Sequence, residues 1–220
     1  MNHYLYIFNV VDAKGLFDEK DTSIVIWTTT PWTLPGNTGI TVGGDFDYSI
    51  VDVGNERYII ASELVDKVMK IAGIEEYKEV QKFKGKEMEG IFCKHPFIDR
   101  KSRVVIGSET TVNVDIVEHT APAYGKEDYL QGLKDNLDMV VCVDAKGHQT
   151  EGAGEFAGLF YAKSNKVIAK WLEDNGYLLK ALPLKHSYPH CWRCKNPVIY
   201  RATDQWFCSV DKFRQNVLCS

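Results

Sequence analysis

The chain of 220 residues is long enough for one substantial domain with a small appendage. Its hydrophobic content of 45% and charged content of 25% are those of an ordinary globular protein, which excludes a disordered chain. No apolar run reaches the ~20 residues of a membrane span, and the first residues lack signal-peptide features, so we expect a cytoplasmic protein without a membrane partner. The net charge of −4 argues against binding a long stretch of nucleic acid, but it permits contact with a few terminal nucleotides.

The hydrophobic pattern predicts many short strands and few helices. The strands are expected at residues 4–11, 24–27, 39–42, 48–53, 57–61, 79–83, 90–93, 103–107, 112–117 and 139–143. The helices are expected from Ser62, as the N-cap, to Gly73, from about Lys126 to Asn136, and from about Ser164 to Asn175. This mixture indicates an α+β protein whose core is a β-barrel or a strongly bent sheet, with peripheral helices.

The stretch 24–37 changes abruptly from a short apolar run to three hydroxyl residues, Thr28, Thr29 and Thr30. Because Pro31 fixes its own φ and keeps Thr30 extended, we expect these hydroxyls at a strand end on a stiff backbone. Hydroxyls beside indole rings suit a ligand with polar edges and a stackable ring, such as the end of a nucleotide chain. The simpler alternative is that threonine is a good strand former and that the prolines close a turn.

Residues 27–37, Trp-Thr-Thr-Thr-Pro-Trp-Thr-Leu-Pro-Gly-Asn, closely resemble the threonine-rich motif in the editing domain (CP1) of the isoleucyl-tRNA synthetases, which are class I aminoacyl-tRNA synthetases. The resemblance covers nearly the whole chain and implies a β-barrel-rich editing core with peripheral helices. It implies that Thr28, Thr29 and Thr30 contact the terminal adenosine and the ester. Further substrate-binding residues implied by it are Trp32, which would shape the pocket, Thr33 and Asn37.

A second candidate element joins His119 to Asp128, which lies nine residues later at the expected start of a helix. The helix dipole favours a carboxylate there, so we expect Asp128 to stay ionised and to pair with an ammonium group. From the residues alone, a helix-capping Asp and an incidental loop His remain the alternative.

Residues 119–129, His-Thr-Ala-Pro-Ala-Tyr-Gly-Lys-Glu-Asp-Tyr, resemble the second signature of the same family. The resemblance implies that Asp128 holds the α-amino group of the ester, that His119 restricts its side chain, and that Ala121 also lies at the substrate. The family usually has Gly-Thr-Gly shortly before this His, and an apolar residue next to it. Here Val114, Asp115 and Ile116 stand at the first positions and Glu118 at the last, which implies a different approach of the backbone to the ligand.

Cys191 and Cys194 form a Cys-x-x-Cys, the spacing of half a tetrahedral zinc site. A closed site needs two further ligands, and the candidates His186, His190 and Cys208 have no paired spacing. In relatives with zinc here, the resemblance implies another Cys pair upstream of the editing domain. A redox pair is the alternative, although no thioredoxin-like context surrounds it. The sequence therefore leaves a structural zinc open.

We expect an editing domain over residues 1–182 and a Cys-x-x-Cys connecting segment over residues 183–220 that leads back to an absent synthetic domain. The synthetic signatures His-x-Gly-His and Lys-Met-Ser-Lys-Ser do not occur in the chain, so ATP would belong only to that absent domain.

The resemblance implies an aminoacyl-tRNA deacylase without a cofactor, which hydrolyses mischarged Val-tRNA(Ile) after transfer and leaves hydrolysis before transfer open. A pocket built for isoleucine cannot strongly exclude valine, which is smaller by one methylene, and isoleucyl-tRNA synthetase is the standard example of this limit. The expected partners are the 3′-terminal aminoacyl-adenosine of tRNA(Ile), noncognate valine and the rest of a synthetase chain. Two alternatives are a non-catalytic module that binds the tRNA 3′ end and a zinc-dependent nucleic-acid-binding fragment.

Overall fold

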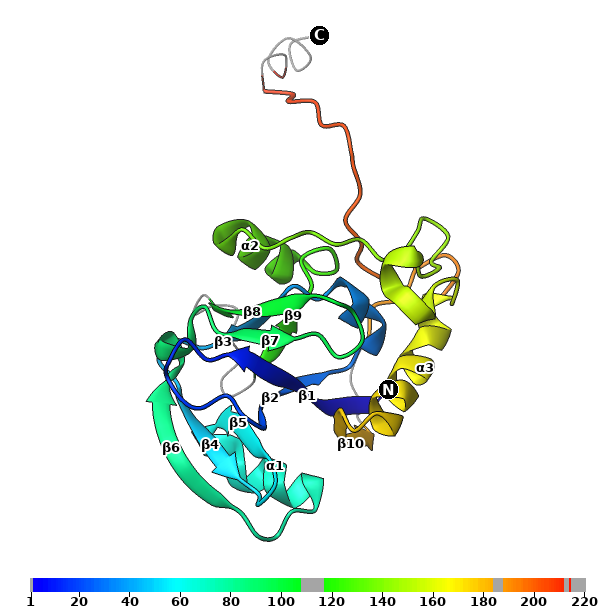
Figure 1. Cartoon of the computed structure of the whole chain (residues 1–220). Helices are drawn as coiled ribbons and strands as arrows, with labels where there is room; N and C mark the ends of the chain where they lie inside the picture. Colours follow the sequence, from blue (N-terminus) through cyan, green and yellow to red (C-terminus); the bar gives the residue numbers. More distant parts are fainter. Residues whose placement is uncertain (1, 108–116, 184–187, 212–213, 215–220) are drawn as a thin grey trace.

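The computed structural model describes residues 2–107, 117–183, 188–211 and 214, which form an α+β structure (Figure 1). Its strands are β1 (Asn2–Asp12), β2 (Thr22–Thr28), β3 (Gly39–Val42), β4 (Asp47–Asp52), β5 (Arg57–Ala61), β6 (Lys78–Lys84), β7 (Phe92–Lys94), β8 (Lys101–Ile106), β9 (Glu118–Thr120) and β10 (Leu178–Pro183). The α-helices are α1 (Val65–Ala72), α2 (Lys126–Asp135) and α3 (Tyr161–Asp174). Short 3₁₀ turns are η1 (Pro31–Gly36), η2 (Ser62–Leu64), η3 (Gly85–Met88) and η4 (Glu151–Phe156).

Six of the described strands close a barrel. Their order is β1-β7-β8-β3-β9-β2, and β2 pairs again with β1 to complete the ring. The sheet extends outside the ring, by β10 on β1 and by β5, β4 and β6 on β2. Since the α-helices lie around this sheet (Figure 1), the predicted α+β class with a β-barrel-rich core and peripheral helices is confirmed.

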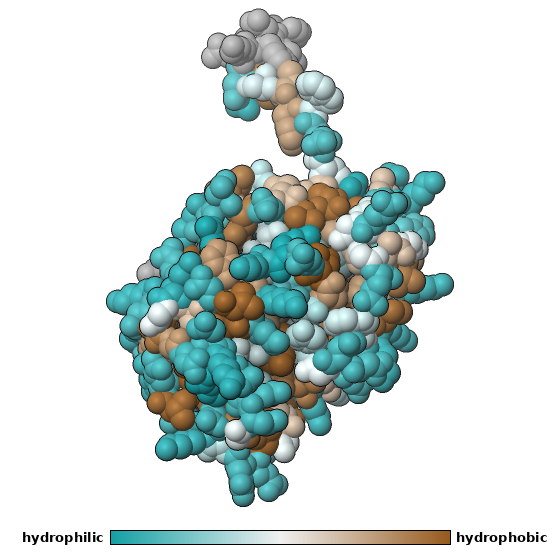
Figure 2. Space-filling model, viewed as in Figure 1, coloured by the Kyte–Doolittle hydropathy of each residue, from teal (hydrophilic) through white to brown (hydrophobic). Residues whose placement is uncertain are grey.

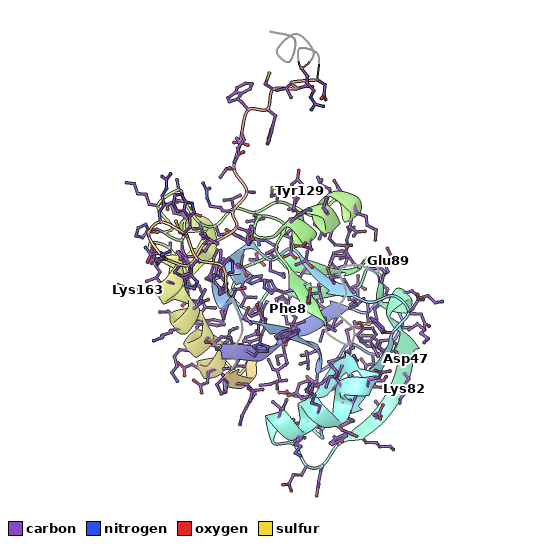
Figure 3. The ribbon with its side chains drawn as sticks, turned by 180° about the vertical axis from the view of Figure 1, so that it is seen from behind. Phe8, Asp47, Lys82, Glu89, Tyr129 and Lys163 are labelled. Carbon is purple, nitrogen blue, oxygen red and sulfur yellow. The ribbon has the colours of Figure 1, made fainter. Side chains whose placement is uncertain are left out.

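The barrel interior is filled by alternate residues of the strands, because successive side chains point to opposite faces. The main hydrophobic cluster of the interior includes Tyr6 and Phe8 of β1 and Ile24 and Ile26 of β2. Figure 3 shows Phe8 in the middle of the barrel. The intervening residues of the same two strands, such as Ile7 and Val25, pack in a second cluster with α1. Both faces of β2 are therefore buried, as its unbroken apolar run predicts.

Helix α1 confirms the helix predicted before Gly73, and its apolar residues Val65, Val68 and Met69 are buried. It ends at Gly73, whose φ of +77° is the left-handed conformation that glycine adopts without strain. The predicted N-cap is wrong. Ser62 lies in η2, and its hydroxyl is 2.7 Å from the Ser49 hydroxyl on β4. This tertiary hydrogen bond engages the hydroxyl that a local helix cap would need.

Two predicted strands have other outcomes. Residues 139–143 were expected to form a buried strand, but Met139 and Val141 are exposed, and only Val143 makes a bridge, to Gln149. An apolar run there covers the surface beside α2 instead of joining the sheet, so that prediction is wrong. The strand predicted at 112–117 lies outside the described residues except for Val117.

The start of β1 and the end of β10 lie side by side, because Asn2 pairs with Pro183. Beyond that point residues 188–202 rest against the body, and the following segment extends away from it (Figures 1 and 2). Its Trp206 and Phe207 are exposed. The division at residue 182 stays a prediction. Among the described residues, none of the helices has the length and apolar character needed to cross a membrane.

Candidate functional site

The three threonines stand where β2 ends, as predicted. β2 stops at Thr28, and η1 begins at Pro31. The Thr30 N–H donates to Thr28 Oγ1 at 3.1 Å, and Thr33 Oγ1 donates to the Thr30 carbonyl at 2.8 Å. The hydroxyls of Thr28 and Thr30 are 3.4 Å apart, and those of Thr30 and Thr33 are 3.5 Å apart. The sequence motif thus folds into a continuous row of hydroxyls.

His119 lies at the end of this row. It is the central residue of β9, which runs between β2 and β3 in the barrel. Its Nε2 atom is 3.2 Å from Thr33 Oγ1, whereas its buried Nδ1 atom has no hydrogen-bond partner among the described residues. Burial lowers the pKa of His119 to about 4, so the imidazole is neutral at physiological pH.

Asp128 lies in the first turn of α2 and is tied to the same region. Its Oδ2 atom accepts a hydrogen bond of 2.8 Å from the N–H of Ala121, two residues after His119. Burial raises the pKa of Asp128 to about 6, because desolvation outweighs the hydrogen bond from Ala121. The carboxylate is therefore ionised at neutral pH, as expected, but protonates in mild acid, which the helix-dipole argument did not anticipate.

Glu118 adds a second partly buried carboxyl. Burial, and then the nearby charges of Asp128 and Glu127, raise the pKa of Glu118 to about 7. Sequence reasoning noted this residue only as a departure from the family pattern. The other departures, at Val114, Asp115 and Ile116, lie outside the described residues.

The remaining predicted substrate-binding residues are packed. The Trp32 ring is buried and meets the rings of Tyr124 and Tyr161 edge to face, with ring centroids 5.1 Å and 5.4 Å apart. The cluster also includes Ala121. The Asn37 amide is also buried, where it donates to the Gly39 carbonyl at 2.8 Å and its Oδ1 accepts from Ser102. The structure thus brings Thr28, Thr30, Thr33 and His119 together, with Asp128 joined through Ala121, and uses Trp32 and Asn37 for packing and hydrogen bonds.

Four side chains that sequence reasoning missed bind the backbone of η1. They are His95, Arg100, Gln149 and Asn165. The sequence gives a signal for one of these contacts, because Pro35 has no N–H to pair with the Trp32 carbonyl, which therefore requires a donor from elsewhere. Nothing in the sequence indicates which distant residue supplies it.

A groove of about 1080 Å³ lies beside the Asp128 helix. It is lined on one side by residues of and near α2, including Lys126 and Tyr129, and on the other by residues of the C-terminal segment, including Tyr200 and Phe207. Figure 3 shows Tyr129 on the side of the body from which this segment extends. The threonines and His119 do not line this groove.

The cysteine pair lies apart from the threonines, in a turn on the C-terminal segment. Hydrogen bonds from the backbone of Cys194 and Arg193 lower the pKa of Cys191, an arrangement that favours a thiolate. Within the described ranges no three His, Cys, Asp or Glu side chains gather as a metal site requires. Of the other predicted ligands, Cys208 is exposed and His186 lies outside those ranges.

The structure matches solved editing domains. It resembles the P. falciparum cytosolic leucyl-tRNA synthetase editing domain with a TM-score of 0.65, at 9% identity over 83% of this chain and 99% of that one. The corresponding P. knowlesi domain gives a TM-score of 0.61 at 12% identity, over 84% of this chain and 97% of that one. The chain therefore has the fold of a CP1 editing domain of the class I synthetases.

The sequence identifies the branch of that class. The chain is 54% identical to the isoleucine–tRNA ligase of Caldicellulosiruptor bescii over 96% of its length, and 47% identical to that of Moorella thermoacetica over 96%. It spans 24% and 23% of those two relatives. No protein-family model matches it. The chain belongs to the isoleucyl-tRNA synthetase family, as its two motifs predicted.

Proposed function

We propose that this chain hydrolyses aminoacyl esters on mischarged tRNA, and specifically removes valine from Val-tRNA(Ile). The observation that carries the proposal is the contact of Thr33 with His119, 86 residues away in the sequence. It joins the threonine row to the strand that leads to Ala121 and Asp128. The partners would be the 3′-terminal aminoacyl-adenosine of tRNA(Ile) and the rest of a cytoplasmic synthetase chain, and hydrolysis of valyl-adenylate before transfer is a second reaction open to the same site.

Asp128 would bind the α-ammonium group that every aminoacyl ester carries. Its hydrogen bond with Ala121 uses Oδ2, and within the described residues Oδ1 has no partner, so that oxygen can accept from an ammonium group. A partly buried carboxylate binds a cation more strongly than an exposed one, because water screens it less. The anchor would be the same for valine and isoleucine.

His119 would discriminate between the two side chains by size. Its ring is neutral and buried, and its low pKa of about 4 makes it a weak base at pH 7. Efficient general bases have pKa values near the working pH, so the chemistry favours a steric wall over proton abstraction. A wall at this position would admit valine and exclude the additional methylene of isoleucine.

The threonine row would bind the ester and the terminal ribose. An ester on a ribose is already activated, so a positioned water and hydrogen-bond donors toward the developing oxyanion suffice for hydrolysis. Thr29, which precedes Thr30 in the sequence but does not join the row, is suited to such a donor role, because it is half-buried and its hydroxyl makes no hydrogen bond within the described residues. No metal or cofactor is required for this reaction.

The test is deacylation of valyl-tRNA(Ile) and isoleucyl-tRNA(Ile) by the 220-residue chain. We expect release of valine and sparing of isoleucine. A chain that binds an unreactive valyl-adenosine analogue and releases no amino acid would instead be a non-catalytic module for the tRNA end. The single variant Asp128→Asn, which should release valine at least about tenfold more slowly, is the control for hydrolysis by a contaminating enzyme.

A further inference from the structure

The 3₁₀ turn η1 cannot satisfy its own backbone. A 3₁₀ helix pairs each carbonyl with the N–H three residues later, and the partner of the Trp32 carbonyl would be Pro35, which has no N–H. The Trp32 N–H stands in the first turn, where no earlier carbonyl of the turn can reach it. Both groups belong to a buried residue, so each needs a partner from elsewhere.

Two side chains supply those partners. Gln149 Nε2 donates to the Trp32 carbonyl at 2.9 Å, and Asn165 Oδ1 accepts from the Trp32 N–H at 2.9 Å. Gln149 precedes η4, and Asn165 lies on α3, so both come from far along the chain. One donor and one acceptor thus hold the two polar groups of a single residue.

The orientation of the Gln149 amide follows from its second contact. Its Nε2 is 3.3 Å from Ser164 Oγ, whose own proton goes to the Tyr161 carbonyl at 2.7 Å. Ser164 Oγ therefore accepts, and the NH₂ group faces both acceptors. A carboxylate at position 149 would face two acceptors without a proton to give.

The residue that these side chains hold directly precedes Thr33. Thr33 contacts His119 through its hydroxyl at 3.2 Å and contacts the Thr30 hydroxyl at 3.5 Å. At the other end of η1, His95 Nε2 donates to the Leu34 carbonyl at 2.9 Å, and Arg100 donates to the Pro35 carbonyl at 2.9 Å. The Gln149 and Asn165 contacts are therefore the ones nearest to the hydroxyl row.

We propose that Gln149 and Asn165 are positioning residues of the hydrolytic site, which hold the Trp32 peptide groups and thereby set Thr30 and Thr33 against His119. The inference rests on the proposed function. Neither side chain touches the substrate, so their loss should lower kcat and leave KM nearly unchanged. Displacement of reacting groups by about 1 Å is known to cost on the order of 10²-fold in rate.

Position 149 requires a hydrogen-bond donor and position 165 requires an acceptor. Variants that keep or remove each function therefore distinguish a positioning role from a general effect on stability. Asn165→Asp keeps the acceptor that the Trp32 N–H needs, whereas Asn165→Leu removes it. Gln149→Glu removes the donor that the Trp32 carbonyl needs, and Gln149→Met does so without adding a charge. Lys163→Met, on the exposed face of α3 (Figure 3), is the matched control.

The experiment measures kcat and KM for valyl-tRNA(Ile) with the 220-residue chain and each variant, with folding checked by thermal melting. We expect kcat to fall about 10- to 100-fold for Asn165→Leu, Gln149→Met and Gln149→Glu. Asn165→Asp and Lys163→Met should stay within about threefold of the unaltered chain. An unreactive valyl-adenosine analogue should bind all five variants with similar affinity.

Equal losses in Asn165→Asp and Asn165→Leu would overturn the proposal, as would a Gln149→Glu variant with unchanged kcat. Because Asn165 is only half-buried, its pair of variants decides the matter even if the Gln149 variants fail to fold. Failure of the unaltered chain to hydrolyse valyl-tRNA would be a different result, since it rejects the proposed function and the positioning roles with it.

Discussion

Two short motifs mark two turns of this molecule, and the turns are held in different ways. The threonine turn (residues 28–36) is buried except at the half-buried Thr29 and Thr30, and side chains from β9, α3 and two loops bind it. The cysteine turn (residues 188–198) is held by its own backbone, with Cys191 N–H bonded to the Asn196 carbonyl at 2.8 Å and Lys195 N–H to the Cys191 carbonyl at 2.8 Å. The threonine turn therefore depends on contacts with residues distant in the sequence, whereas the cysteine turn depends on hydrogen bonds among its own residues.

This difference suggests how each turn should respond to change. A site assembled from distant elements loses its geometry when a contact that holds it is removed. A local turn with exposed side chains can change without consequence for the barrel. Substitutions near the threonine turn should therefore alter hydrolysis, and substitutions in the cysteine turn should not.

The largest effect is expected at Asp128. Asp128→Asn keeps the shape and removes the negative charge that would bind the substrate ammonium group. A hydrogen bond to a charged group contributes about 1.5–3 kcal/mol, so kcat/KM for valyl-tRNA should fall by at least about tenfold. Glu127→Gln, an exposed neighbour on the same helix, is the control and should hydrolyse normally. A folded Asp128→Asn chain with normal kcat/KM would remove this residue from the site.

The second prediction concerns specificity. His119→Ala opens more space than the one methylene that separates isoleucine from valine, so isoleucyl-tRNA should become a substrate while valyl-tRNA is still hydrolysed. A general-base role predicts instead that both activities fall, by about 10²–10⁴-fold. Paired deacylation assays separate the two roles. Loss of valine hydrolysis without any gain toward isoleucine would refute the steric wall.

The third prediction is a pH dependence. Since burial raises the pKa of Asp128 to about 6, its carboxylate is lost as the pH falls through that value. Ammonium binding needs the carboxylate, so kcat/KM should decrease by about tenfold between pH 7 and pH 5. His119, with a pKa of about 4, stays neutral over this range.

Glu118 also titrates in this window, because its pKa is raised to about 7. The variant Glu118→Gln distinguishes the two carboxyls: it should keep the acidic limb of the profile, whereas Asp128→Asn should abolish it. A profile that flattens in Glu118→Gln and persists in Asp128→Asn would assign the titration to Glu118.

A smaller effect is expected at Thr29, beside the threonine row. Thr29→Val removes a hydroxyl that has no partner in the described part of the chain, while keeping shape and β propensity. The cost should be that of one hydrogen bond, about 0.5–1.5 kcal/mol, seen as a decrease of roughly threefold to tenfold in kcat/KM without a change in melting temperature. Thr28→Val should affect the melting temperature as well, because Thr28 Oγ1 accepts the Thr30 N–H. If Thr29→Val instead lowered the melting temperature and left kcat/KM unchanged, the Thr29 hydroxyl would stabilise the fold rather than contact the substrate.

The sequence indicated the local features of this site and missed the tertiary ones. The end of β2 at Thr28 and the start of α2 at Lys126 follow from local signals, namely the change from apolar to hydroxyl residues and the proline-containing loop before the helix. The contact of Thr33 with His119 depends on β9 lying between β2 and β3, which no local pattern specifies.

The surroundings of individual residues escaped the sequence for the same reason. Trp32 and Asn37 are both buried in contacts with the protein, and their predicted roles at the substrate stay predictions. The helix-dipole argument for Asp128 considered only its own helix, whereas burial between α2 and β9 sets its pKa. The resemblance to the synthetase family conveyed the fold because two motifs are specific to it, although neither motif contains Gln149 or Asn165.

The smallest effect is expected at the cysteine turn. A double variant, Cys191→Ser with Cys194→Ser, should hydrolyse valyl-tRNA within about twofold of the unaltered chain, and a zinc chelator should have as little effect. Two sulfur ligands form half of a tetrahedral site, and the described residues offer no third ligand in place.

One contact connects the segment that follows the cysteine turn to the surroundings of the threonine turn. Ala202 N–H donates to the Ala123 carbonyl at 2.7 Å, and Ile199 and Ala202 pack against the cluster that holds Trp32. If zinc organised the cysteine turn, its removal could loosen this contact and disturb the threonine turn. Metal content, melting temperature and deacylation are therefore measured together. Stoichiometric zinc whose removal lowers both melting temperature and kcat would show that the cysteine turn supports the site, and the contrast between the two turns would no longer hold.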